Sequence, residues 1–133
     1  MPVLDTDLLI NYLRKHPKAV KLISSLIESG EPLKTTIFNV CELYKGAYMS
    51  SNVPRSIRNI SDWLKHFQII SFMRNDANIN GQISVDLRRR GLHIGDFNEL
   101  IATLIITNEE ILITRNIKHY NRVPRIALQT WEL

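Results

Sequence analysis

Apolar residues along the chain fall into two patterns: short continuous runs, and longer segments in which they recur every three or four positions. Short runs are typical of buried strands, and the longer period is typical of helices that bury one face. The pattern predicts strands at residues 2–4, 33–36, 68–72, 111–114 and 125–130. It predicts helices from about residue 6 to residue 16, and at 18–28, 38–49, 54–67, 76–90 and 96–108.

Short strands that alternate with helices predict an α/β fold, in which a central parallel sheet of about four to five strands is covered by helices on both faces. The length of 133 residues fits a single domain. In open parallel sheets, ligands bind beyond the carboxyl ends of the strands. The polar residues that follow the predicted strands are therefore the first candidates for a functional site.

Composition narrows the classes of function only slightly. The net charge of +4 favours anionic partners such as nucleic acid. The single cysteine, Cys41, excludes an intramolecular disulfide and a zinc site of the Cys/His type, and its apolar helical surroundings predict a buried side chain. No apolar run approaches the ~20 residues of a membrane span, and the N-terminus lacks the basic region of a signal peptide. We expect a cytoplasmic protein without a membrane partner.

Oxygen-bearing side chains gather where strands end and helices begin. The residues that this edge of the sheet could bring together are Asp5, Glu42, Asp96, Asn98, Thr114 and Asn116. Oxygen ligands without nearby cysteine or histidine favour a hard cation, Mg²⁺ or Mn²⁺. For Asp7 and Asp96, capping of a helix N-terminus is an alternative role and the commoner one. Asp5 ends a buried strand, which makes it the stronger candidate for a metal ligand.

Four stretches, in this order and at these separations, resemble a known family: VLDTDLLINYL, CELYKGA, GLHIGDFNELIATL and ILITRNIKHYNRVP. They resemble the PIN domain, and more narrowly the ribonuclease toxins of VapBC toxin–antitoxin modules. The resemblance covers residues 2–131 and implies a single PIN domain over 1–133 with three-layer α/β/α architecture. It implies a Mg²⁺- or Mn²⁺-dependent endoribonuclease of a type II toxin–antitoxin system. The partners that it implies are RNA, a cognate antitoxin protein and a second copy of the chain.

The resemblance also assigns roles to residues. The catalytic set that it implies is Asp5, Glu42, Asn98 and Asn116, with Thr6 and Thr114 in support. Asp5 would bind the metal directly, and Glu42 and residue 98 would bind a metal or orient its waters. The metal would activate a water molecule and stabilise the charge that develops on the phosphate.

Asn98 departs from the family pattern I-G-x-x-D-x-L-I-A, which places a third acid at this position. Two explanations stay open: an engineered substitution that disables a toxic nuclease, or a natural variant in which Asp96 serves as the metal ligand. Residues two apart on a helix point in different directions, so Asp96 could help only from a non-helical turn. We expect impaired metal binding in the chain as written. The alternative function is a catalytically dead PIN-fold protein that captures an antitoxin or another partner.

Basic and aromatic residues near the predicted site are candidates for contacts with RNA. Arg115 and Lys118 lie beside the proposed metal edge and are expected to bind backbone phosphates. Tyr120 and Tyr44 could stack on bases, although Tyr44 fits the core better. His93 is expected to be a solvent-facing loop residue. The apolar face of the predicted helix 54–67 could bind a partner, but burial in the core is the simpler interpretation.

Overall fold

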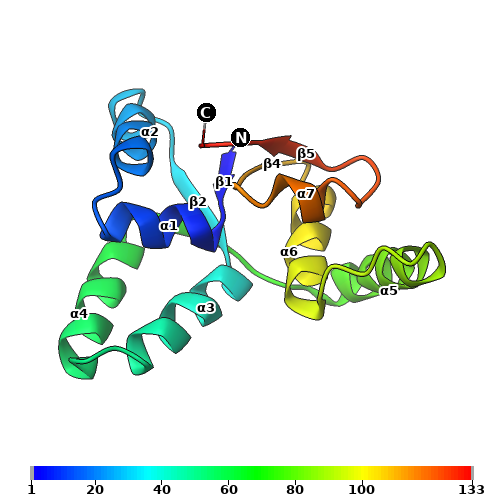
Figure 1. Cartoon of the computed structure of the whole chain (residues 1–133), viewed down its shortest axis with the longest axis horizontal. Coiled ribbons are helices and arrows are strands. Elements are labelled where there is room, and N and C mark those ends of the chain that lie inside the picture. The colour runs from blue at the N-terminus through cyan, green and yellow to red at the C-terminus, as the bar shows by residue number, and fades with distance from the viewer. Residues whose placement is uncertain (1, 133) are drawn as a thin grey trace.

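The helices and strands follow one another in the alternating order that the sequence predicts (Figure 1). The computed structural model describes residues 2–132. Its elements are β1 (Pro2–Leu4), α1 (Thr6–Leu13), α2 (Pro17–Glu28), β2 (Leu33–Thr36), α3 (Ile37–Tyr48), α4 (Val53–Leu64), β3 (Phe67–Ile70), α5 (Arg74–Arg89), α6 (Asp96–Thr107), β4 (Ile111–Ile113), α7 (Ile117–Tyr120) and β5 (Ala127–Gln129).

Every hydrogen-bonded strand pair is parallel, as expected, but the strands form one three-stranded and one two-stranded sheet where the sequence predicted a single sheet of four to five. β4 pairs with β1 on one side and with β5 on the other, and β2 pairs with β3. The two groups lie side by side, because β1 contacts β2 and the Thr35 hydroxyl donates to the carbonyl of Leu4 at 2.8 Å. The spatial order is therefore β3-β2-β1-β4-β5. The chain moves outward from β1 in one direction and returns to its other side with β4, so the strand order reverses between β1 and β4.

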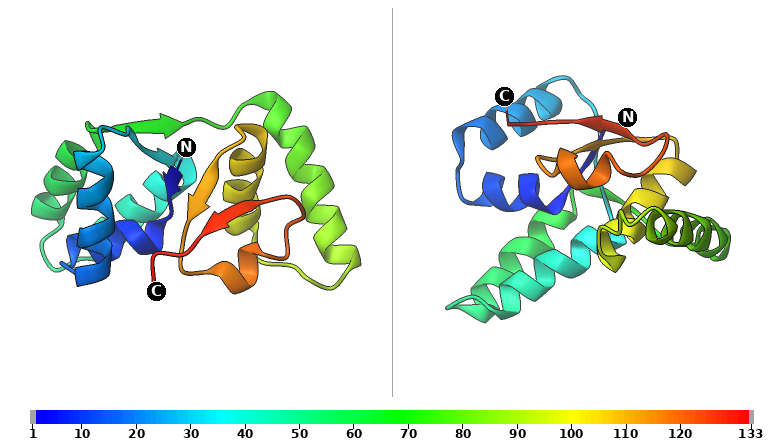
Figure 2. Two further views of the ribbon diagram at one scale, coloured as in Figure 1. Left: turned by 90° about the horizontal axis from the view of Figure 1, so that it is seen from above. Right: turned by 45° about the vertical axis from the view of Figure 1, so that its right-hand side comes forward.

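Helices cover both faces of the strands, which gives the expected three layers (Figures 1 and 2). Leu4 and Ile113 pack into one apolar cluster with residues of α1 to α4. Val3 and Leu112 pack into a second cluster with residues of α5, α6 and α7. Because successive side chains of a strand point to opposite faces, three-residue strands are enough to join the two clusters.

Several boundaries and exposures differ from the predictions. α1 ends at Leu13, three residues early, because the ring of His16 caps α2 and Pro17 opens that helix. α7 was not predicted, since four residues carry no periodicity. Cys41 is exposed, which contradicts the predicted burial.

The predicted helix 54–67 ends at Leu64 in the structure, as α4. Its Ile60 is buried and Trp63 packs beside it, so this apolar face belongs to the core as the simpler interpretation had it. Among the described residues, no helix has the length and apolar character that crossing a membrane requires.

Candidate active site

A hollow of about 350 Å³ opens at the carboxyl ends of β1 and β4, where the strand order reverses. The side chains that line it come from four places in the sequence: Asp5, Thr6, Asp7, Ile10, Asn11, Arg14, Glu42, Asn98, Arg115 and Asn116. Thr114, the residue after β4, reaches the same carboxylates by hydrogen bonds. Of the site residues predicted from sequence, the fold brings together all of the catalytic set and both supporting threonines.

Asp5 lines this hollow and is only 6% exposed. It caps α1, since its Oδ1 accepts from the backbone N–H of Thr6 at 2.9 Å. The same oxygen accepts from Nδ2 of Asn39 at 2.9 Å, and Oδ2 accepts from the Thr114 hydroxyl at 2.8 Å. A helix, a side chain of α3 and the end of β4 therefore fix one carboxylate.

Burial of this carboxyl group raises the pKa of Asp5 from 3.8 to about 7. The neighbouring charges of Asp7 and, to a smaller extent, Glu42 raise it further, whereas the hydrogen bonds from Thr114 and Thr6 lower it. The carboxylate form is therefore costly in the protein alone, and a bound cation would favour it.

Glu42 reaches the hollow from the second turn of α3. Its Oε1 accepts from the Thr6 hydroxyl at 2.6 Å, and that hydroxyl accepts from Nδ2 of Asn39 at 2.8 Å. Asn39 is fully buried and is held by Thr36, whose hydroxyl donates to its Oδ1 at 2.7 Å. Sequence reasoning missed Asn39, because its partners lie more than thirty positions away in the chain. A polar residue three places before Glu42 in an apolar helix was the available signal.

Asp7 also faces the hollow, although the sequence favoured a capping role for it and did not include it among the site residues. The cap of α1 is Asp5, and Asp7 lies in the first turn of the helix. Its Oδ2 lies 3.0 Å from the Thr114 hydroxyl and accepts from the backbone N–H of Arg115 at 3.1 Å. Its Oδ1 accepts from Nε1 of Trp131 at 3.0 Å. The hollow therefore contains three carboxylates besides the amide of residue 98.

Asn98 lies on the side of the hollow that α6 forms. Its Nδ2 donates to the carbonyl of Ile94 at 2.9 Å, and its Oδ1 accepts from the hydroxyl of Tyr120 at 3.1 Å. Tyr120 is fully buried, which contradicts the exposed position predicted for it. Burial and the three carboxylates raise the pKa of Tyr120, so its hydroxyl is a hydrogen-bond donor to Asn98 at all working pH values.

The other acids of the 96–99 stretch point away from the hollow. Asp96 is the first residue of α6, after the cap Gly95, and its exposed carboxylate lies 3.5 Å from the guanidinium of Arg88. Glu99 is buried, and its Oε2 lies 2.7 Å from Nδ1 of His93. Ligand atoms of His93, Asp96 and Glu99 lie within 4.8 Å of one another, but none of these residues lines the hollow, and Asp96 faces the guanidinium of Arg88. Asp96 is therefore not placed to replace a ligand at position 98.

Of the two basic residues predicted to contact RNA, one lines the hollow and the other does not. Arg115 lines the hollow, and its guanidinium lies over the ring of Trp131 at 5.6 Å from the ring centre. Lys118 is exposed on α7 and does not line the hollow. Arg14, at the end of α1, lines the hollow and was not proposed. Asn116 lines it as well, and its Oδ1 lies 2.6 Å from Nδ1 of His119.

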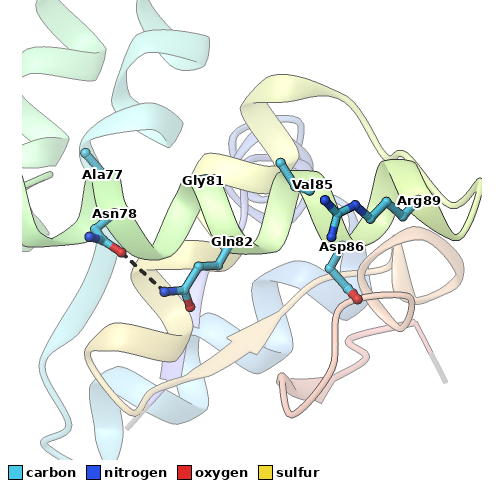
Figure 3. Close-up of a pocket in the computed structure, with 7 residues that line it drawn as sticks. All are labelled: Ala77, Asn78, Gly81, Gln82, Val85, Asp86 and Arg89. Carbon is cyan, nitrogen blue, oxygen red and sulfur yellow. Dashed lines mark hydrogen bonds between the residues drawn. The ribbon is translucent and has the colours of Figure 1, made fainter.

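A second hollow, of about 640 Å³, runs along one face of α5 and is open to solvent (Figure 3). Its polar side chains are Asn78, Gln82, Asp86 and Arg89, and Gln82 donates to Asn78 at 3.3 Å. Its one acid, Asp86, is already paired with Arg90 at 2.6 Å. The reactive groups of the described residues are thus concentrated in the hollow around Asp5.

No family model matches the chain. Individual proteins of similar sequence and fold do match it over almost its whole length. Ribonuclease VapC2 of Rickettsia felis is 26% identical over 98% of this chain and 97% of its own. The crystal structure of VapBC2 from Rickettsia felis bound to a promoter DNA fragment matches with a TM-score of 0.88 and 25% identity over 98% of each chain. The structure of VapBC-1 from nontypeable Haemophilus influenzae matches with a TM-score of 0.88 and 25% identity, over 99% of this chain and 98% of that one.

The chain is an α/β protein of the PIN fold, with an acidic hollow where its strand order reverses. Within that fold, it is a homologue of the VapC ribonucleases over almost its whole length.

Proposed function

We propose that this chain is a metal-dependent endoribonuclease and the toxin of a type II toxin–antitoxin pair. The observation that carries the proposal is the convergence of Asp5, Asp7 and Glu42 in one open hollow beside Thr114. Its similarity to VapC ribonucleases and to the structures of VapBC complexes supports the same class of activity.

The donor set fits a hard divalent cation, Mg²⁺ or Mn²⁺. The groups in the hollow offer carboxylate, amide and hydroxyl oxygens, which are the ligands these ions prefer. Burial and, to a smaller extent, the charges of Asp7 and Glu42 raise the pKa of Asp5, and a bound cation would favour its carboxylate form. When bound, the cation would stabilise negative charge on the phosphate oxygens and lower the pKa of a water molecule.

The chain's own residues would prepare the substrate. Asp5 and Glu42 would hold the cation, and the Thr114 hydroxyl and the Asn39 amide keep the Asp5 carboxylate in one orientation. Arg115, on the rim, would bind a phosphate of the RNA backbone, with Lys118 available to a neighbouring phosphate.

Cleavage of RNA by the purified chain tests this proposal. We expect cleavage with Mn²⁺ or Mg²⁺ and none with EDTA, and we expect Asp5→Asn and Glu42→Gln each to slow it by about 100-fold. Asp62→Asn, an exposed acid on α4, is the matched control and should cleave at the unmutated rate. Cleavage that survives EDTA or Asp5→Asn would refute a metal-dependent site in this hollow.

A catalytically dead binding protein is the second candidate function. One observation favours it: an apolar hollow of about 560 Å³ adjoins the acidic one, and exposed Met49 and Phe97 line it beside Thr6 and Glu42. An antitoxin segment could cover this surface and the carboxylates together. Tight capture of a cognate antitoxin by a chain that cleaves no RNA, with any metal and also as Asn98→Asp, would favour this alternative.

The proposed toxin would act on RNA in the cytoplasm and form a homodimer. Light scattering coupled to size exclusion would give twice the mass of 15.4 kDa if the homodimer forms. A mass of one chain at micromolar concentration would contradict it.

A further inference from the structure

The structure gives position 98 a role that an amide fills and a carboxylate cannot. Asn98 donates through Nδ2 to the carbonyl of Ile94 and accepts through Oδ1 from Tyr120. A carboxylate at this position would bring an oxygen against the Ile94 carbonyl oxygen, which offers no proton. Asn98 therefore ties the turn before α6 to the buried hydroxyl of α7, and it brings no negative charge to the hollow.

The charge that residue 98 lacks is present elsewhere in the same hollow. Asp7 lines the hollow from the first turn of α1, and its Oδ2 shares the hydroxyl of Thr114 with Oδ2 of Asp5. One oxygen of each carboxylate therefore lies within 3.0 Å of the same hydroxyl oxygen, which brings the two acids close together. Glu42 lies on the other side of Thr6 and completes a group of three acids.

The partners of Asp7 orient it without neutralising it. Trp131 Nε1, the backbone N–H of Arg115 and the shared Thr114 hydroxyl are neutral donors, and a carboxylate with about four acceptor sites keeps one free beside them. Between residues 2 and 132, no ion pair involves Asp5, Asp7 or Glu42. The guanidinium groups of Arg14 and Arg115 also line the hollow, but among the described residues neither forms an ion pair with these acids, and a divalent cation could bind all three carboxylates directly.

We propose that Asp7 replaces residue 98 in the metal site: Asp5, Asp7 and Glu42 carry the three negative charges that hold the cation, and Asn98 is a structural latch. This inference rests on the proposed metal-dependent function. It makes Asn98 compatible with an active chain, because the charge of the site is retained.

Titration of the full, metal-free chain with Mn²⁺ by calorimetry at pH 8 tests the inference without relying on activity. We expect Asp7→Asn to weaken Mn²⁺ binding about 10-fold or more, as Asp5→Asn does, because each variant removes one carboxylate from the site. Asn98→Ala and Tyr120→Phe should lower the melting temperature and leave the Mn²⁺ affinity within about threefold. Asp62→Asn is the control for loss of an acid far from the hollow.

A second pair of variants separates charge from folding. Asp7→Glu and Asp7→Gln place side chains of nearly the same size at this position, so any shared loss of packing cancels between them; they differ in charge and in the one oxygen that Gln replaces by an NH2 group. The inference expects Asp7→Glu to bind Mn²⁺ more tightly than Asp7→Gln. Equal affinities in this pair would overturn it.

The remaining outcomes distinguish this inference from the proposed function. If Asp5→Asn loses Mn²⁺ while Asp7→Asn keeps it, the metal site stands and the role of Asp7 is refuted. If Asn98→Asp tightens binding about 10-fold and Asp7→Asn has no effect, position 98 is the ligand and the inference is refuted. If no substitution in the hollow changes Mn²⁺ binding, both the inference and the metal-dependent function fail.

Discussion

Asp5 illustrates at the scale of one residue how the fold creates a reactive group. Its carboxylate has three kinds of neighbour. It caps α1, it accepts hydrogen bonds from Asn39 and Thr114, and it lies near the charge of Asp7. Burial outweighs the hydrogen bonds, so the pKa of Asp5 rises to about 7. At neutral pH the group is poised between its two protonation states, and a cation competes with a proton for it.

The raised pKa of Asp5 predicts a loss of stability as the pH rises. The folded chain binds this proton more tightly than the unfolded chain, whose carboxyl group has a pKa near 3.8. Between these two pKa values, rising pH therefore costs the folded state up to about 4 kcal/mol, and above pH 7 the loss is complete. Urea unfolding of the metal-free protein at pH 4, 5, 6, 7 and 8 should show this decline, and Asp5→Asn should lack most of it.

The quantity to compare is the slope of the unfolding free energy against pH. Asp5→Asn also changes the hydrogen bonds from Thr114 and Asn39, which shifts stability at every pH. Asp62→Asn, which removes an exposed acid, should keep the slope of the unmutated chain. Identical slopes for Asp5→Asn and the unmutated protein would show that Asp5 titrates normally.

At the scale of elements, the start of α6 decides where residue 98 points. Gly95 caps this helix with φ +100° and ψ 146°, a conformation that side-chain-bearing residues rarely adopt. The turn lets the chain enter α6 with Asn98 facing the hollow and Asp96 facing solvent. Gly95 is therefore required by its backbone conformation, since a Cβ there would meet only Nδ2 of Asn98, at 3.9 Å.

Substitution of Gly95 by alanine should destabilise the protein by about 2 kcal/mol, because alanine is strained in this conformation. Gly81 provides the matched control: it lies inside α5 with open space around it, so Gly81→Ala should stabilise the protein by about 1 kcal/mol. Thermal and urea unfolding of the two variants measure both effects. The explanation from backbone strain fails if the two substitutions change stability in the same direction.

The elements were predictable from sequence and the contacts between them only in part. The apolar period found every helix except α7, because that helix has only four residues. It placed the end of α1 too late, since an apolar pattern does not reveal that the ring of His16 caps α2. Asp5 and Thr114 were found because parallel strands bring their ends to one edge, and Glu42 because it can reach that edge from the start of a helix and matches the family pattern. The role of Asn39 and the direction in which Asp7 points were not predictable. Both depend on hydrogen bonds to residues far away in the sequence, which no local pattern reveals.

At the scale of the whole molecule, residues far apart in the sequence, Asp7 and Trp131, meet at the site. Trp131 is 5% exposed, packs in the cluster of α1 and α2, and donates to Asp7 from 124 positions away. Its ring also packs at nearly a right angle against the ring of His16. The segment after β5 thus orients an acid that follows β1, and the site is complete only when the last strand has joined the sheet.

The bond from Trp131 to Asp7 predicts a coupling between the end of the chain and the metal site. Trp131→Phe keeps an aromatic ring but removes the donor to a charged acceptor, so we expect a loss of about 2 kcal/mol in the free energy of unfolding. Asp7 then loses one of the hydrogen bonds that fix its orientation, so Mn²⁺ binding should also weaken. Trp63→Phe is the matched control: Trp63 stacks on Tyr12 in the same apolar cluster and does not line the hollow. It should cost stability through packing and leave Mn²⁺ affinity unchanged, whereas equal Mn²⁺ affinities in the two variants would show that Trp131 stabilises the fold without orienting Asp7.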